Sequence, residues 1–175
     1  MLGRIRRWLS RDDGVVAIEF AMLALPFFAL LIGSVEFSLA FAASYMLEGG
    51  TVEAARLVRT GEAVDSGDPE TAFKDRLCDQ VSFLIPCNDI VYESIVLDSF
   101  ASASDFAPQY DASGNMVSQG FSAGASENVV MVRVFYKYEF MTPFIGNLVT
   151  NGGGSSSMNL MSTAVIKNEP YTFGG

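Results

Sequence analysis

The chain has 175 residues, 50% of them hydrophobic, which is enough for one small folded domain and a membrane segment but not for two full-sized domains. It contains no histidine, so it lacks the commonest general base, the usual partner of a nucleophilic serine or cysteine, and the commonest zinc ligand. Its two cysteines, Cys78 and Cys87, cannot form a four-thiolate site and are not spaced as a CxxC redox pair. We therefore expect no enzymatic activity, no metal and no cofactor.

Charge is distributed unevenly along the chain. Residues 1–14 carry four arginines against two aspartates, a net of +2, whereas residues 15–175 carry seven Lys and Arg against 18 Asp and Glu, a net of −11. Phosphate backbones would repel so acidic a body, so we expect no nucleic-acid partner. A basic amino terminus in front of an apolar run is typical of an exported or membrane-inserted protein.

The apolar run begins at Val15. Between Val15 and Val35 the only charged residue is Glu19, and the length is close to the roughly 20 residues that span a bilayer core. The arginines in front of it predict a cytoplasmic amino terminus and place everything after about residue 40 outside. Two other interpretations stay open: a cleavable secretory signal with Ala40-Phe41-Ala42 as its small-residue site, or a core helix of a soluble protein.

Glu19 stands out within this run. A carboxylate inside an apolar segment costs a few kcal/mol on insertion scales, so it needs a partner or a functional reason unless it lies at the membrane edge. Pro26 and Gly33 mark places where the helix can bend or loosen.

The residues around Glu19 resemble a known processing site. The stretch Gly14-Val15-Val16-Ala17-Ile18-Glu19-Phe20 resembles that of type IV-like prepilins, in which a basic leader ends in glycine. The longer run from Gly14 to Glu36 is similar to TadE-like pseudopilins of the tight-adherence (Flp) pilus system. Further stretches that look like that family are Ala54-Ala55-Arg56, Thr60-Gly61 and Lys167-Asn168-Glu169-Pro170.

This resemblance implies a maturation step. A membrane-embedded prepilin peptidase would cut after Gly14, and Glu19 and Phe20, at the fifth and sixth mature positions, would guide processing and assembly. Phe20 stands where the Flp branch commonly has tyrosine. Cleavage would give Val15 a free α-amino group about one helical turn from Glu19, and the amine of one subunit could neutralise the glutamate of its neighbour.

Helical periodicity continues past the membrane segment to about Arg59, with Gly49-Gly50 as an expected weak point or break. Residues 60–69 form a turn-rich acidic linker. Pro69 then opens a helix to about residue 84, capped by Asp68, with one apolar side formed by Phe73, Leu77, Val81 and Leu84.

Cys78 and Cys87 bracket the end of this helix. Outside the cytoplasm the simplest expectation is a disulfide that ties the helix to the following loop and stabilises the fold by about 2–3 kcal/mol. Two free buried thiols and a labile catalytic pair stay open as alternatives.

The rest of the sequence, after this helix, predicts three strands. Residues 90–100 form the first, and residues 127–140 the clearest, with alternating Val130, Val132 and Val134 facing a covering helix. The last, 158–167, is expected to pair antiparallel with it. Between the first two we expect a solvated loop with a turn at 111–115, which presents contacts to neighbouring subunits. Residues 142–149 predict a short helix or apolar flap, and 151–157 a flexible turn.

Together these elements predict an α+β, pilin-like fold in which a long amino-terminal transmembrane helix packs on a small antiparallel sheet. Its parts are a basic prepilin-type leader (1–14), a transmembrane or filament helix (15–38), a helix continuation (39–60) and an exported α+β domain (61–175).

The favoured function is a minor or initiating pseudopilin, since major Flp pilins are far smaller. It would be located in a bacterial inner membrane, with its carboxy-terminal domain outside the cytoplasm, or at the base or tip of a pilus. Its expected partners are other pilins, the prepilin peptidase and the membrane assembly platform. The alternatives are a signal-anchored periplasmic or surface binding protein or adhesin outside any filament, and an exported carboxylate-based hydrolase, although no spacing singles out two converging carboxylates.

Overall fold

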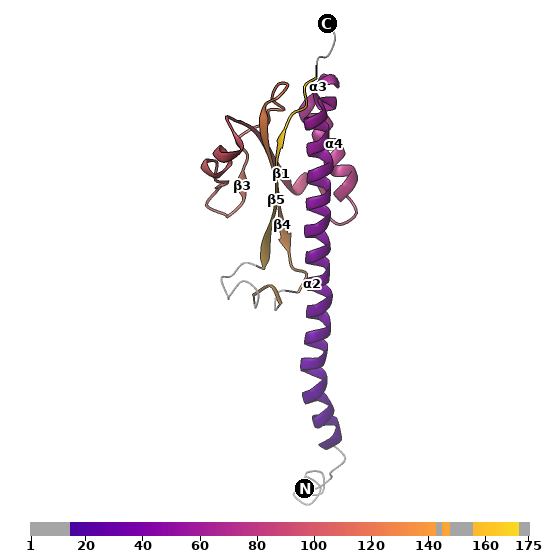
Figure 1. The fold of residues 1–175 in the computed structure, drawn as a ribbon. Coiled ribbons are helices and arrows are strands. Elements are labelled where there is room, and N and C mark those ends of the chain that lie inside the picture. The colour runs from indigo at the N-terminus through magenta and orange to yellow at the C-terminus, as the bar shows by residue number, and fades with distance from the viewer. Residues whose placement is uncertain (1–14, 143–144, 148–155, 172–175) are drawn as a thin grey trace, which may run out of the picture. The chain divides into compact units, whose positions relative to one another are not determined.

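The computed structural model describes residues 15–142, 145–147 and 156–171 (Figure 1). The chain forms two compact units, Met1–Ser38 and Leu39–Gly175. The predicted leader with Gly14, most of the segment predicted as a helix or flap after residue 142, and most of the predicted 151–157 turn lie outside the described residues.

Helix α2 (Val15–Thr60) contains the described part of the first unit and continues into the second. Its predicted end near Arg59 is confirmed. From Leu39 onward, one face of α2 is buried in the core against the sheet, and most of its side chains are small, which lets the helix backbone come close to the strands. The buried apolar residues of this face are Ala40, Ala43, Leu47, Ala54, Ala55 and Val58.

The predicted break at Gly49-Gly50 is wrong, because α2 runs through both glycines. The two positions differ in their surroundings. A Cβ on Gly50 would lie 2.8 Å from Val81 Cγ1 and 3.1 Å from Leu77 Cδ1, whereas a Cβ on Gly49 would have nothing within 4 Å. Gly50 therefore serves close packing between two helices, and tertiary contact outweighs the local helix-weakening effect of glycine.

Two shorter helices follow. The linker after α2 contains the single turn α3 (Glu62–Asp65), and α4 (Pro69–Val81) begins as predicted at its proline. Asp68 caps α4 by accepting hydrogen bonds from the Thr71 hydroxyl (2.7 Å) and the Thr71 amide (3.2 Å). Both bonds hold the pKa of Asp68 below its usual value, and the bond from the Thr71 hydroxyl has the larger effect. The helix ends at Val81, earlier than the predicted residue 84. Phe73, Leu77 and Val81 of its predicted apolar side are buried, whereas Leu84 lies beyond the helix and is half-buried.

The sheet is antiparallel, in the order β1-β4-β5. Its strands are β1 (Ile90–Leu97), β4 (Val129–Glu139) and β5 (Ser157–Lys167). The central strand β4 pairs with all of β1, from Ile90↔Tyr136 to Leu97↔Val129, and with β5 in an unbroken register from Val129↔Lys167 to Glu139↔Ser157. All three predicted strands and the predicted pairing of the last two are confirmed.

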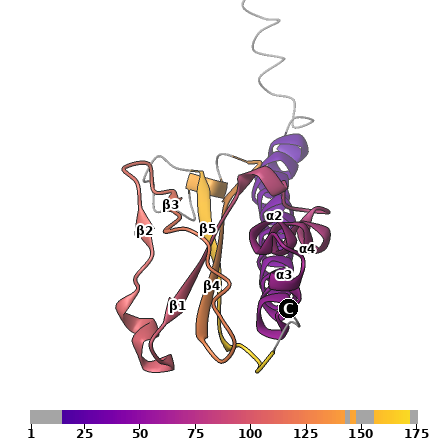
Figure 2. The same cartoon turned by 90° about the horizontal axis from the view of Figure 1, so that it is seen from above.

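Both faces of β4 are buried. Val130, Val132 and Val134 face the helices, as predicted, and on the opposite face Met131 and Phe135 are also buried. Figure 2 shows α2 and α4 on one side of the sheet and the segment containing β2 (Gln109–Tyr110) and β3 (Met116–Val117) on the other. The domain thus has three layers within Leu39–Gly175: the helices, the sheet, and a loop layer formed by residues 98–128 between β1 and β4.

The loop predicted between the first two strands is largely exposed, as expected, and it also covers one face of the sheet. After the 3-10 helix η3 (Phe100–Asp105), the chain forms the β2–β3 hairpin, and the Tyr110 ring lies 6.0 Å from that of Phe135. The predicted turn is confirmed, because Asp111 Oδ1 accepts hydrogen bonds from the amides of Asn115 (2.9 Å) and Ser113 (2.8 Å). These bonds hold the pKa of Asp111 below its usual value, and the bond from the Asn115 amide has the largest effect. The apolar second face of β4 needs a cover, and this loop supplies it.

The carboxy-terminal segment is tied to the end of α2. Gly61 follows the helix in the left-handed conformation (φ 81°), which glycine adopts without strain. The Glu169 amide donates to the Arg59 carbonyl (2.9 Å), one of the carbonyls that a helix end leaves without an intrahelical donor. Asn168 donates through Nδ2 to the carbonyl of Ala125 (3.0 Å) in the loop layer. The two motifs at 60–61 and 167–170 thus meet at one pole of the domain, which we call the polar clamp.

We expect alanine to have opposite effects at the neighbouring glycines. Gly49→Ala should stabilise the chain by about 0.5–1 kcal/mol, because alanine is the better helix former and the site is open. Gly50→Ala should destabilise it by about 1–3 kcal/mol, because the β-branched Val81 has little freedom to move away. Pulse proteolysis in urea of the full chain in detergent measures both. Equal effects at the two positions would contradict the close packing at Gly50.

Candidate assembly site

The amino-terminal part of α2 presents an apolar surface. Of the helices described, α2 is long and apolar enough to cross a membrane, with a mean hydropathy of 2.5 over its most apolar 18-residue window, none of which is buried within the protein. A helix that is apolar all round is typical of a membrane span or of a helix packed inside an assembly. Its exposed apolar residues include Val16, Ile18, Phe20, Met22, Leu23, Leu25, Phe27, Phe28, Leu30 and Leu31.

Two of the predicted processing and assembly residues share a face of this helix. Val15 is the first residue of α2, and Glu19 follows four residues later, so both side chains lie on one face. Both are exposed, and so is Phe20, at 70%. Glu19 is thus a carboxylate on an otherwise apolar surface, available to a group from another molecule. Gly14 lies outside the described residues.

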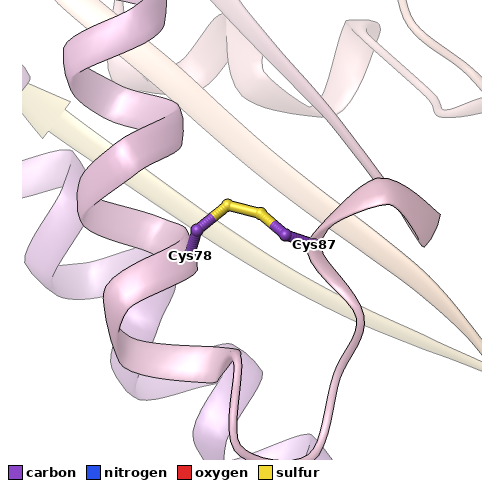
Figure 3. The surroundings of a disulfide bond; sticks show 2 residues. All are labelled: Cys78 and Cys87. Atoms are coloured by element: carbon purple, nitrogen blue, oxygen red, sulfur yellow. A yellow bond between two sulfur atoms is a disulfide. The ribbon is translucent and has the colours of Figure 1, made fainter.

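The disulfide predicted between Cys78 and Cys87 is confirmed (Figure 3). The two Cα atoms are 5.6 Å apart, within the usual range for a disulfide. Cys78 lies in the last turn of α4, and Cys87 opens the 3-10 helix η2 (Cys87–Asp89) that leads into β1. The bond closes a short loop in which Ile85 is buried and Phe83 is 86% exposed.

A buried ion pair, not predicted from the sequence, joins two strands of the sheet. Glu93 on β1 and Arg133 on β4 lie directly opposite each other on the loop side of the sheet. Arg133 Nη1 donates to Glu93 Oε1, and the side chains are only 5% (Arg133) and 0% (Glu93) exposed. A cross-strand acid–base pair can be sought in sequence only once the strand register is known, because 40 residues separate the two positions.

The remaining polar atoms of this pair bind the loop layer. Glu93 Oε2 accepts from the Gln119 amide (3.0 Å), and Arg133 Nη2 donates to the Phe106 carbonyl (2.6 Å). Two loop segments are therefore held to the sheet through one ion pair. Because buried charges are costly unless they are paired and hydrogen-bonded, the pair and the loop stabilise each other.

A depression of about 620 Å³ lies where β1 begins, lined by Asp89, Val91, Asn115, Phe135, Tyr136, Lys137 and Glu139. Lys137, in this lining, is held by hydrogen bonds to the Ser113 carbonyl and to Asn115 Oδ1, both 3.3 Å. The pKa of Tyr136 is raised mainly by burial and, to a smaller extent, by the charge of Asp89. In the part of the chain that the structure describes, no group of three His, Cys, Asp or Glu side chains is placed to hold a metal ion.

These features define a class of protein: a disulfide-containing α+β domain with a long helix, α2, that begins as an exposed apolar segment with a single carboxylate near its start. Residues 14–56 match the family model described as TadE-like protein, so the resemblance drawn from the sequence is confirmed over that segment. The matched segment begins at Gly14 and ends within α2. No curated protein and no solved structure matches the chain.

We expect the ion pair to be essential for stability. Arg133→Met should cost about 3–5 kcal/mol, because it leaves the Glu93 carboxylate buried without its partner. The double variant Glu93→Leu/Arg133→Met should recover much of that loss, since no unpaired charge remains. Lys137→Met, on the same strand but without a buried ion pair, should change the free energy of unfolding by less than about 1 kcal/mol. Equal losses in Arg133→Met and the double variant would show that the charge itself is not what matters.

Proposed function

We propose that the chain is a minor or initiating pseudopilin of a tight-adherence pilus, processed after Gly14 by a prepilin peptidase and assembled through α2. The observation that carries the proposal is the uncovered apolar start of α2, with Glu19 one turn after Val15. The similarity to TadE-like proteins over residues 14–56 supports it and associates the chain with that pilus system.

Assembly would depend on one charge pair per subunit contact. Cleavage after Gly14 converts the amide nitrogen of Val15 into a charged amine, at the start of a helix whose next charge is Glu19. Each charge alone is costly in lipid or in a packed bundle, so the amine of one subunit next to the glutamate of its neighbour removes both costs. Because only one axial offset brings the two together, the pair also sets the register between neighbouring helices.

The other features fit an exported subunit without chemistry of its own. The disulfide suits a compartment outside the cytoplasm, and the four arginines before α2 favour a cytoplasmic amino terminus. We infer location in a bacterial inner membrane or at the base or tip of a pilus, with other pilins, the prepilin peptidase and the assembly platform as partners. A folded domain of this size favours a minor or initiating role.

Processing is tested first, by the intact mass and amino-terminal sequence of the protein from native membranes. We expect the mature chain to start at Val15. The variant Gly14→Leu should stay full-length, while Gly3→Leu, a matched change elsewhere in the leader, should be cut normally. A start near Ser44 would instead indicate an ordinary secretory signal, and an intact Met1 a signal-anchored binding protein or adhesin.

The charge pair is tested by Glu19→Gln, which keeps the size of the side chain and removes its charge. We expect normal membrane insertion but at least about a tenfold loss of the protein from sheared surface filaments, because the amine of the neighbour is left unpaired. Glu53→Gln, on an exposed part of the same helix, is the control and should assemble normally. Assembly of Glu19→Gln at the wild-type level would rule out the pairing.

A further inference from the structure

The two edges of the sheet differ in how they are covered. Along β1, the loop layer pairs with the outer side of the strand: the Ser94 amide donates to the Gly120 carbonyl (3.0 Å), and the Ser122 amide donates to the Ser94 carbonyl (2.9 Å). Phe121 then packs beside α4, with its ring 5.3 Å from that of Phe73. The middle of the β1 edge is therefore occupied, which leaves no continuous edge there for a further strand.

The β5 edge is open. Hydrogen bonds from Phe140 N to Ser156 O and from Asn168 N to Asn128 O, both 2.8 Å, mark the two ends of the β4–β5 ladder. Hydrogen-bonded pairs alternate along an antiparallel ladder, so the even-numbered residues of β5 bond to β4 and the odd-numbered ones direct their N–H and C=O groups outward. The outward residues include Asn159, Met161, Thr163 and Val165. In the described part of the chain, no strand lies beyond β5.

Nothing in the sequence of β5 discourages pairing. The strand has 11 residues, its register with β4 is continuous, it contains no proline, and its only charged residue is Lys167 at the end. Proteins usually protect such edges with charges, prolines, bulges or covering segments, as the loop layer protects β1 here. An uncharged edge of this length therefore indicates a site that another strand occupies.

A groove of about 280 Å³ accompanies this edge. Its walls are Ser44, Glu48 and Val52 on α2 and Met161–Thr163 on β5. Val52, on the α2 wall of the groove, is 56% exposed, and Met161, which shares the opposite face of the sheet with Phe135, is 48% exposed, so an added strand would cover apolar surface on both faces of the sheet. Among the described residues that line the groove, Glu48 alone is charged, which favours a basic side chain opposite it.

Neither antiparallel pairing with β5 of a second copy nor pairing with its β1 fits this edge. Strand β5 leads to Glu169, which bonds to Arg59 at the end of α2, so helix and strand end at the same pole. Two copies joined antiparallel through β5 would therefore begin their α2 segments at opposite poles, which one membrane does not allow. Pairing of β5 with β1 of another copy is blocked by the cover on β1. This step rests on the membrane anchoring in the proposed function.

We propose that the β5 edge and its groove bind an extended segment of a different exported polypeptide. The segment runs antiparallel to β5, the more stable pairing, and adds a fourth strand to the sheet. Its side chains are uncharged except for a Lys or Arg opposite Glu48. Main-chain hydrogen bonds to Met161, Thr163 and Val165 supply affinity, and the groove supplies specificity.

The test uses a photo-crosslinking amino acid in place of Val52 in the full-length chain, expressed in its native cells. We expect one light-dependent adduct with a different polypeptide. Thr163→Pro removes an outward N–H, a change that edge strands tolerate, and should reduce the adduct at least tenfold. Thr163→Val keeps the N–H and should leave the adduct within twofold of wild type. The same crosslinker at Phe83, which is exposed elsewhere, should not give this adduct.

A second variant keeps the test independent of proline effects on folding. Glu48→Arg leaves the strand intact and should also reduce the adduct at least tenfold, by like-charge repulsion. Formation of the Cys78–Cys87 disulfide and wild-type resistance to protease show that each variant is folded. An adduct of two copies, a crosslink within one chain, no adduct, or an adduct that neither variant weakens would overturn the proposal. Because adduct formation is scored separately from cleavage after Gly14, failure here is distinguishable from failure of the proposed function.

Discussion

The domain depends on one buried interaction, the ion pair between Glu93 and Arg133. A three-stranded sheet covered by helices on one face would leave the apolar second face of β4 in water. The chain covers that face with irregular backbone, whose polar groups need partners. The ion pair provides them at Phe106 and Gln119, while the loop excludes water from the two charges. The loop layer and the buried pair therefore stabilise each other.

Close approach is the second constraint, and it determines the composition of α2. Beyond Leu39 the buried face of the helix is mostly alanine, and Gly50 brings α4 against α2 at Leu77 and Val81. Before Leu39, where no protein covers the helix in its most apolar window, the residues are large and apolar. One helix thus presents two kinds of surface: small side chains where it packs on its own domain, and large apolar side chains where lipid or other helices can cover it.

Local and periodic features were predictable from sequence. The extent of α2, the Asp68-Pro69 start of α4, the three strands and the disulfide all follow from capping, periodicity and compartment. The loop layer and the ion pair were not, because they depend on which strands become neighbours. Gly50 was misjudged for the same reason: a glycine that weakens a helix and one that admits a neighbouring helix look alike in sequence. Of the candidate site, the helix and its exposed Glu19 were predictable, whereas the unequal sheet edges required the register.

The polar clamp has a mechanical consequence. Strand β5 and helix α2 end at the same pole, where Glu169 is bonded to Arg59 through both its amide and its side chain, whose Oε1 lies 3.3 Å from Arg59 Nε. A pull along α2 is therefore passed at that pole into β5, along the strand direction. The β4–β5 ladder is then loaded in shear, so its hydrogen bonds resist together instead of opening one after another. A force on the helix must therefore break the hydrogen bonds along the 11-residue strand β5 together before the domain opens.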